Sequence, residues 1–373
     1  MYLIEWGFWQ MATESKTKRK VYEAKRSPKE YAAKNFYESD LEEIHFQRVS
    51  EKPHARGPVF AFNDTYFEMR CGGSEEKRGL ITIMTLGAVA PTINAWSELT
   101  YSILKLNLSI FPEFSILLIA LNILSFSVGS CIIYFYLKYG LRFTRLEIFN
   151  SRQLLIRFNR KTQQVHLHRP RSCGGIVTFP WKTTGSTAIF PEDDSLSAGM
   201  RLGLVWHPSL TGLPHMEMAL LGKQGQGGSE LRDEWEFIRR YMEEGPDAVP
   251  RPRLSTQLPS PIQAFSAQFE GLGRFFRKSS WLFKVVLLMV WPAFVIIGTG
   301  HWLSLLLCWR PRWPKVIREA GRPGKPVPPV TTLADYPPAI QERLLANADR
   351  WQLKPGRRPE KQPRKAKKNT PTV

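Results

Sequence analysis

The sequence has few cysteines and no recognisable catalytic motif. Its 373 residues include only four cysteines, Cys71, Cys131, Cys173 and Cys308, and no CxxC pair. This excludes a disulfide scaffold and a zinc ribbon. Residues 222–228 are rich in glycine but lack the residue order of a phosphate-binding loop, and neither a GxSxG elbow nor an HExxH helix occurs. We therefore expect a protein that is not an enzyme and has no cofactor.

The strongest candidate for a metal site is the group His166, His168 and Cys173. The two histidines share one face of an expected strand, and the cysteine follows five residues later. No second cysteine or acidic residue stands at ligand spacing. We interpret both histidines as polar residues that point outward, opposite Val165 and Leu167, and expect no metal.

Acidic residues are scarce, and the resulting charge is unevenly distributed. The chain has 52 Lys and Arg against 33 Asp and Glu, and residues 251–373 hold 22 of the basic residues and only six acidic ones. A basic surface over the whole protein, typical of nucleic-acid binding, is therefore not expected. The basic run from Lys354 to Lys368 is either attracted to anionic lipid headgroups or is a solvated end.

Two long runs without charge predict membrane-spanning helices. The first covers residues 80–97 and extends to Leu104 if Glu98 is tolerated, and the second covers residues 114–137. The second run has 24 residues, which exceeds ordinary core helices and matches the thickness of a bilayer. The tyrosines at its end, Tyr134, Tyr136 and Tyr139, suit the headgroup level. The alternative is a soluble helical hairpin inside a large core.

Basic residues flank the two runs and predict their orientation. They are Arg70, Lys77, Arg78, Lys138, Arg142, Arg145, Arg152 and Arg157. The connection between the runs carries only Glu98, Lys105 and Glu113 as charged residues. Because basic residues resist translocation, we expect both flanks to be cytoplasmic and a short connection to lie outside.

Alternating apolar residues after the second run predict short strands. They are expected at residues 153–159, 164–168, 176–181, 187–190, 202–207 and 216–221. An amphipathic helix at residues 229–244 follows, with Ser229 as its N-cap and Gly245 as its stop. Six strands and a closing helix are the element order of a pleckstrin-homology-like domain, which by itself specifies no function.

Five basic residues of this domain are candidates for contact with lipid or a partner: Arg157, Arg160, Lys161, Arg169 and Arg171. Plain positive-inside anchoring explains the same residues equally well.

A third apolar run covers residues 285–308. A single crossing would place the basic tail outside, which the charge rule disfavours. Pro292, Gly298 and Gly300 are expected to break the run into two short helices, so we favour a re-entrant or interfacial segment over a third span.

The predicted fold is an α+β integral membrane protein. It contains a two-helix transmembrane hairpin, a cytoplasmic β-rich domain that resembles the pleckstrin-homology fold and is closed by an amphipathic helix, and the third apolar segment. The expected segments are a flexible basic N-terminal region (1–57), a β-hairpin that packs on the cytoplasmic domain (58–79), the transmembrane hairpin (80–137), the cytoplasmic β-rich domain with its C-terminal helix (138–245), a linker (246–280), the third apolar segment (281–309) and a basic, proline-rich tail (310–373). The first ten residues precede a second methionine, Met11, and are interpreted as an upstream start or as a short helix at the membrane surface.

Four sequence motifs together resemble a known family. They are NDTYFE at residues 63–68, FPW at 179–181, EWEFIRRYMEEG at 234–245 and Trp313–Pro314. They are similar to an uncharacterised bacterial membrane family catalogued as domain of unknown function 6708, over most of residues 58–320. The motif residues Trp181, Trp235, Ile238 and Tyr241 are interpreted as structural.

The resemblance implies a location in the bacterial inner membrane, with the N-terminus and the β-rich domain in the cytoplasm. Because members resemble proteins encoded near type VI secretion effectors, it also implies an immunity or accessory role through binding of a toxin in the membrane or at its cytoplasmic face. The alternative is a membrane-tethered adaptor or lipid-binding module. The expected partners are anionic lipid headgroups and a cognate toxin or secretion component, and nucleic acid is not expected.

Overall fold

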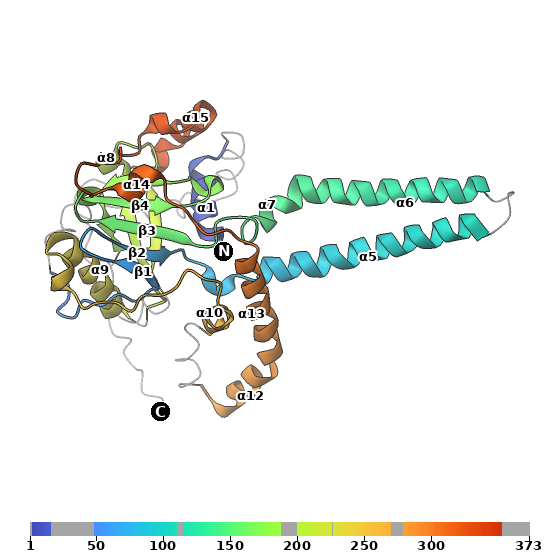
Figure 1. Cartoon of the computed structure of the whole chain (residues 1–373), viewed down its shortest axis with the longest axis horizontal. Coiled ribbons are helices and arrows are strands. Elements are labelled where there is room, and N and C mark those ends of the chain that lie inside the picture. The colour runs from blue at the N-terminus through green and yellow to red at the C-terminus, as the bar shows by residue number, and fades with distance from the viewer. Residues whose placement is uncertain are drawn as a thin grey trace, which may run out of the picture.

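The structure is a computed structural model that describes residues 2–15, 48–109, 115–187, 200–225, 227–269 and 279–352. It is an α+β protein in which two long helices project side by side from a β-domain (Figure 1). A second, shorter helical arm leaves the same domain close to the base of the first.

One antiparallel sheet forms the centre of the β-domain. Its strands are β1 (Val59–Phe62), β2 (Tyr66–Cys71), β3 (Leu154–Asn159), β4 (Gln164–His168), β5 (Val177–Pro180), β6 (Gly185–Ser186), β7 (Leu202–Trp206) and β8 (Glu217–Leu221). The strand order is β5-β4-β3-β2-β8-β7-β6, and β1 pairs with β2 as the predicted hairpin. Strand β2 pairs with β3 along its whole length but meets β8 only at Cys71↔Leu221. The sheet is therefore nearly divided into two halves at this joint.

The sheet recruits strands from both sides of the helical hairpin, because β1 and β2 from the segment 58–79 join the strands of the segment 138–245. Phe67 of β2 stacks on Phe158 of β3 at 4.6 Å between ring centroids, although the hairpin separates the two strands in the sequence. Local alternation cannot reveal such a pairing. The strand expected at residues 187–190 also differs: β6 ends at Ser186, and residues 188–190 lie outside the described ranges.

Helix α9 (Gly228–Glu243) confirms the predicted amphipathic helix, and the four motif residues pack at its contact with the sheet. Trp235, Ile238 and Tyr241 are buried on the helix, and the Trp181 ring lies 5.5 Å from the Trp235 ring. The Tyr241 hydroxyl donates to the carbonyl of Asn63 at 2.6 Å. The N-cap is Gly227, so the prediction of Ser229 was wrong by two residues.

The helical hairpin consists of α5 (Leu80–Ser109), α6 (Ser115–Phe135), the π-helical turn η4 (Tyr136–Gly140) and α7 (Leu141–Thr144). Segments Leu80–Lys105 and Ile119–Thr144 are long and apolar enough to cross a membrane, as the sequence predicted. Of the two ends considered for the first run, the structure agrees with the longer one, because α5 continues as one helix past Leu104 to Ser109. Residues 97–109 contain no glycine or proline to end the helix, so Glu98 lies within it.

The third apolar run forms α12 (Trp281–Met289) and α13 (Trp291–Leu306), which meet at a bend of 50°. The predicted break is confirmed at Pro292, which occupies the first turn of α13. Gly298 and Gly300 do not break the helix. They lie within α13, where a Cβ atom would meet the Phe265 ring of α10 (Pro261–Gln268) and the side chain of Ile83. The re-entrant path stays a prediction.

Both ends of the described chain pack on the sheet, which corrects the predicted flexibility of the N-terminal region at residues 3–12. Helix α1 (Leu3–Ala12) buries Glu5 and Ala12, and Leu344 of α15 (Pro338–Ala346) belongs to the same core. The Asn347 amide donates to the carbonyl of Ala12 at 3.0 Å, so the two ends meet. The basic run Lys354 to Lys368 lies outside the described residues.

The remaining helical turns are short. They are η2 (Glu75–Lys77), η5 (Arg171–Cys173), η6 (Trp181–Thr183), α8 (Pro208–Thr211), η8 (Pro246–Ala248), α14 (Lys315–Glu319), η9 (Leu333–Asp335) and η10 (Ala348–Trp351).

Candidate functional site at the foot of the helical hairpin

Arg78 is the centre of a buried polar cluster at the point where the hairpin leaves the sheet. It lies between η2 and α5 and has no solvent exposure. Its Nε atom donates to the Ser304 hydroxyl of α13 at 2.7 Å, and its guanidinium also donates to the Glu147 carbonyl at 3.2 Å. Further bonds reach the Arg152 carbonyl and the carboxylate of Glu75. A single side chain therefore joins α5, α13 and the segment that enters β3.

The charges of Arg78 and Glu75 stabilise each other in this cluster. Burial opposes the charge of Arg78, but the negative charge of Glu75 holds the pKa of the guanidinium above its usual value. Burial likewise opposes ionisation of Glu75, yet nearby positive charge, including that of Arg78, holds the pKa of its carboxyl well below the usual range. Both groups are therefore charged at neutral pH, and each depends on the other.

Glu147 connects the second end of the hairpin to the first. Its carboxylate accepts hydrogen bonds from the backbone N–H and the hydroxyl of Thr82, both at 2.8 Å. Thr82 lies in the first turn of α5, where backbone N–H groups lack partners within the helix and a negative charge is favourable. Glu147 follows α7, so the segment after α6 caps the start of α5.

Helix α13 approaches α5 closely in the same cluster. His301 contacts the Glu75 carboxylate at 3.3 Å and the Gln268 amide of α10 at 3.2 Å. Gly79 has φ +104°, and a Cβ there would lie 2.4 Å from the backbone of α13. Only glycine permits both this conformation and this approach. The foot of the hairpin is thus a fixed junction of three helices, built from structural hydrogen bonds.

Two of the five predicted contact residues are buried in ion pairs, which corrects their assignment to the surface. Arg157 pairs with Glu68 of β2 at 2.8 Å and lies between the rings of Tyr66 and Trp313. Trp313 belongs to the segment after α13, which covers this face of β3. Its indole N–H donates to the same Glu68 carboxylate at 2.6 Å.

Arg169 directly follows β4 and is buried. It forms two hydrogen bonds with the Glu217 carboxylate, and the longer one measures 2.8 Å. Burial alone would raise the pKa of Glu217, but Arg169 and His215 lower it to about 2. The pair therefore stays ionised and is not available to a lipid headgroup.

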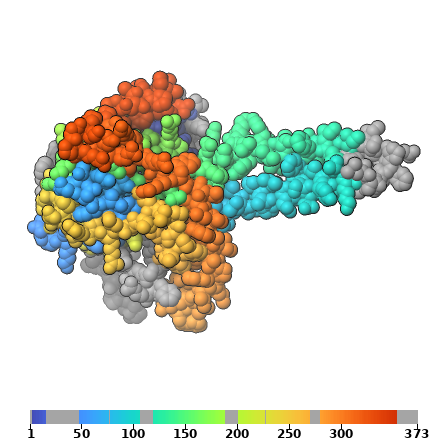
Figure 2. Space-filling model, viewed as in Figure 1, coloured from blue at the N-terminus to red at the C-terminus, as the bar shows by residue number. Residues whose placement is uncertain are grey.

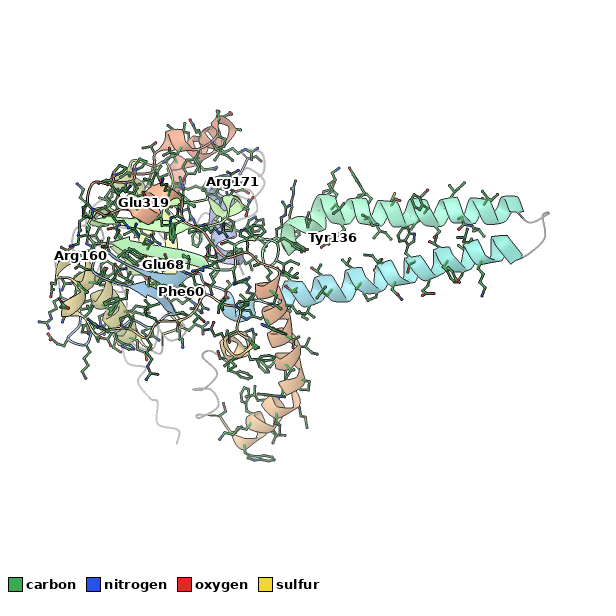
Figure 3. The ribbon with its side chains drawn as sticks, in the orientation of Figure 1. Phe60, Glu68, Tyr136, Arg160, Arg171 and Glu319 are labelled. Atoms are coloured by element: carbon green, nitrogen blue, oxygen red, sulfur yellow. The ribbon has the colours of Figure 1, made fainter. Side chains whose placement is uncertain are left out.

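The three remaining predicted residues lie at opposite ends of the β-domain. Arg160 and Lys161 form the β3–β4 turn, where both contact Asp64. Arg171 in η5 is exposed and lies on the side from which the hairpin emerges, whereas Arg160 lies on the far side (Figure 3). The five residues therefore do not form one surface. Arg142 and Arg145, assigned by sequence only to anchoring, are exposed beside the hairpin.

The histidines do not point outward into solvent as predicted. His166 is fully buried beside Trp313 and shares a hydrogen bond with the Thr178 hydroxyl at 2.9 Å. Burial and the charge of Arg157 lower the pKa of His166 to about 3. Cys173 packs with Val165 in the main core and does not join the histidines. Within the described ranges, no group of three or more His, Cys, Asp or Glu side chains is arranged to hold a metal.

A hollow of about 410 Å³ lies beside His168 and is lined by residues 309–312. His168 contacts the carbonyl of Arg312 there at 3.2 Å. Its lining contains no carboxylate.

Sequence reasoning missed the role of Arg78, which it treated only as a flanking basic residue, and did not consider Glu147. A charged residue directly before the first apolar run and another shortly after the second were visible in the sequence, but their partners, the Glu147 carbonyl for Arg78 and Thr82 for the Glu147 carboxylate, depend on how the hairpin closes.

Comparison with protein-family models gives one match. The model described as a family of unknown function (DUF6708) matches residues 132–324, from α6 to the segment after α14. No curated protein and no solved structure matches the chain significantly.

Proposed function

The chain belongs to the DUF6708 family of unknown function, and on that premise we propose that it is a non-enzymatic binding protein anchored in the bacterial inner membrane. The hairpin holds it in the bilayer, and the β-domain is presented to a partner at the cytoplasmic face. The observation that carries this proposal is the distribution of side chains on the hairpin.

The contact between α5 and α6 is made of small and polar side chains. The Trp96 indole N–H donates to the carbonyl of Ser125 at 3.0 Å, and the Thr100 and Ser125 hydroxyls lie 3.3 Å apart. Gly129 lets the Trp96 ring approach so closely that a Cβ would lie 2.3 Å from it. Helices in lipid pack through small residues and interhelical hydrogen bonds, because apolar burial between them gains little.

The outward surface of α6 is made of large apolar side chains. Ile123, Leu124 and Phe126 are each at least 60 % exposed. A hairpin in water would bury such residues and expose its polar ones. The reverse arrangement supports insertion into hydrocarbon.

Basic residues at the foot support a cytoplasmic β-domain. Lys138 lies over the rings of Tyr134 and Tyr139, an arrangement suited to the headgroup level. Arg142 and Arg145 follow on the side of the β-domain. By the positive-inside rule this side faces the cytoplasm.

We further propose a pleckstrin-homology-like fold whose strands begin at β2, with the helical hairpin inserted between β2 and β3. Strands β2 to β5 form one half of the sheet and β6 to β8 the other, and α9 closes the core. This order of strands and helix supports the proposal, and binding by such a domain is argued from its surface rather than from the fold. Exposed Arg171, Arg142 and Arg145 favour contact with anionic headgroups, at about 1 kcal/mol for each residue near the surface.

The immunity role implied by the family resemblance is the same proposal with a toxin as the partner. Its test is expression of the toxin encoded beside this gene, in cells with and without the chain. Protection of the cells supports immunity, and equal killing leaves the adaptor role.

Fractionation tests the anchoring itself. Membranes from cells that express the full chain are extracted at alkaline pH, and spheroplasts and inverted vesicles are treated with protease. We expect the chain to stay in the membrane and the sheet to be cut only in inverted vesicles. Release of intact chain by alkaline extraction, or digestion of the sheet from the periplasmic side, would refute the proposal.

A further inference from the structure

Contacts within the hairpin fix the level of Glu98 relative to α6. Trp96 and Thr100, two residues before and after Glu98, both bond to Ser125, and a Cβ on Gly129 would touch Trp96. Glu98 therefore lies level with α6 near residue 127, deep within the helix pair rather than in the connection between the helices.

The uncharged run of α6 places that level near the middle of a bilayer. The run covers residues 114–137, which at 1.5 Å per residue is about 36 Å, slightly more than the ~30 Å of hydrocarbon. Its centre lies near residue 126. Lys138 and its tyrosine contacts then lie ~18 Å from the centre, at the headgroup level. Moving Glu98 to the outer boundary would pull Lys138 and Arg142 deep into the hydrocarbon. In the central position Lys105 lies ~10 Å from the centre, from where its long side chain reaches the outer headgroups, so this position costs less.

Glu98 points away from α6. One residue turns an α-helix by ~100°, so Glu98 lies ~200° from both Trp96 and Thr100, which face α6. Four other exposed residues follow the same face at spacings of three and four, and we call this set the outer stripe: Gly87, Pro91, Asn94, Glu98 and Tyr101. No other described segment covers this side of α5 along most of its length (Figure 2).

The outer stripe differs from the outward surface of α6, although it ends in the large residue Tyr101. The outward surface of α6 carries large apolar residues such as Ile123 and Phe126. The stripe instead combines small residues, which let another backbone approach, with an amide and a carboxylate. Among the described residues, none forms a hydrogen bond or ion pair with the Glu98 carboxylate. An acidic residue at the centre of a membrane helix costs about 2.5–3.5 kcal/mol unless it is paired.

Resting on the membrane anchoring proposed above, we infer that the outer stripe binds a transmembrane helix of another protein that carries a Lys or Arg side chain at mid-bilayer depth. Such a cation pairs with Glu98, and Asn94 one turn away supplies a hydrogen bond. A second copy of this chain fits less well, because a twofold axis along α5 would place Glu98 against Glu98. The basic residue on this face, Lys105, lies ~10 Å farther along the helix.

A designed guest helix tests the inference. The full chain, fused to one half of a split reporter, is expressed in cells with a 21-residue Leu/Ala transmembrane helix that carries one central Lys and the other half. A guest with a central Leu measures the background. We expect the Lys guest to give a signal at least tenfold above the Leu guest, and Glu98→Leu to abolish the difference.

The matched control is Ser127→Leu, at the same depth on the exposed surface of α6. It should leave the signal of the Lys guest unchanged. Equal binding of both guests, persistence of the signal in the Glu98→Leu chain, or a stronger signal between two copies of this chain would each overturn the inference. Alkaline extraction of every variant separates these outcomes from failure of anchoring, since a chain that leaves the membrane contradicts the proposed function instead.

Discussion

Replacement of Arg78 by methionine tests the junction that joins the hairpin to the sheet. Methionine retains much of the volume of the side chain but removes every hydrogen bond that the guanidinium donates. The Glu75 carboxylate would then be buried without its cation, and the Ser304 hydroxyl and the Glu147 carbonyl would lose their donor. We expect the free energy of unfolding to fall because these groups cannot reach water.

The expected magnitude follows from the burial of the pair. Removal of one partner from a buried ion pair costs about 3–5 kcal/mol. Because the entropy of unfolding grows with chain length, each kcal/mol lowers the melting temperature of a protein of this size by about 1–2 °C, so the Arg78→Met variant should melt about 3–10 °C below the parent. Thermal unfolding of the full chain in detergent measures the shift. Hydrogen exchange at Thr82 adds a local reading, because α5 loses its fixed position when the junction opens.

Two variants separate this mechanism from a general effect of losing an arginine. Arg142→Met removes an exposed guanidinium near the hairpin and should change stability by no more than about 0.5 kcal/mol. Addition of Glu75→Gln to Arg78→Met removes the unpaired charge and should restore part of the loss. A melting temperature within 2 °C of the parent for Arg78→Met, or no recovery in the double variant, would refute the reasoning.

Three further changes probe the hairpin and the β-domain. Gly129→Leu should push Trp96 away from α6 and lower the yield of a disulfide cross-link between Thr100→Cys and Ser125→Cys severalfold. Burial raises the pKa of Glu234 to about 7, above its value in the unfolded chain. The folded state therefore favours the protonated carboxyl, and the free energy of unfolding falls as pH rises from about 4.5 through 7. The free energy of unfolding of Glu234→Gln, measured in urea, should therefore equal that of the parent at pH 4 and exceed it by about 3 kcal/mol at pH 8. A variant as stable as the parent at both pH values would contradict this. Trp235→Ala should cost about 3–5 kcal/mol in the same assay, because its indole is fully buried.

The elements that local patterns specify could be predicted from the sequence. The uncharged runs around α5 and α6 needed only a count of apolar residues, and the apolar spacing around Trp235 located α9. The alternation of apolar and polar residues likewise predicted β3 and β4 as strands with one face toward a core. In each case the signal lies within one stretch of about 20 residues.

The environment of the polar residues could not be predicted, because distant segments create it. Arg157 and His166 alternate with apolar neighbours, as residues that face solvent do. In the structure Trp313, which is more than 140 residues later in the sequence, packs over both side chains. This second cover makes both faces of β3 buried, and an alternating strand then carries paired charges on one face. Alternation distinguishes the two faces of a strand but does not show which of them meets water.

The depth of Glu98 also limits how the β-domain can meet the membrane. Leu80 lies 18 residues before Glu98 in the same helix, or ~27 Å below the bilayer centre, so the junction around Arg78 lies ~12 Å beneath the hydrocarbon. A depth of ~12 Å beneath the hydrocarbon corresponds to the headgroups and the water next to them. The loop that carries Arg171 lies on the hairpin side of the sheet, near this level (Figure 3). Arg160 lies at the end of β3 that is farther from the hairpin, and the length of β3 adds ~20 Å to its distance from the membrane. That distance exceeds the screening length of ~8 Å at physiological salt, so Arg160 would not sense the charge of the headgroups. With the chain anchored as proposed, we therefore expect contact with lipid at Arg142, Arg145 and Arg171, and we expect the β3–β4 turn to face away from the membrane.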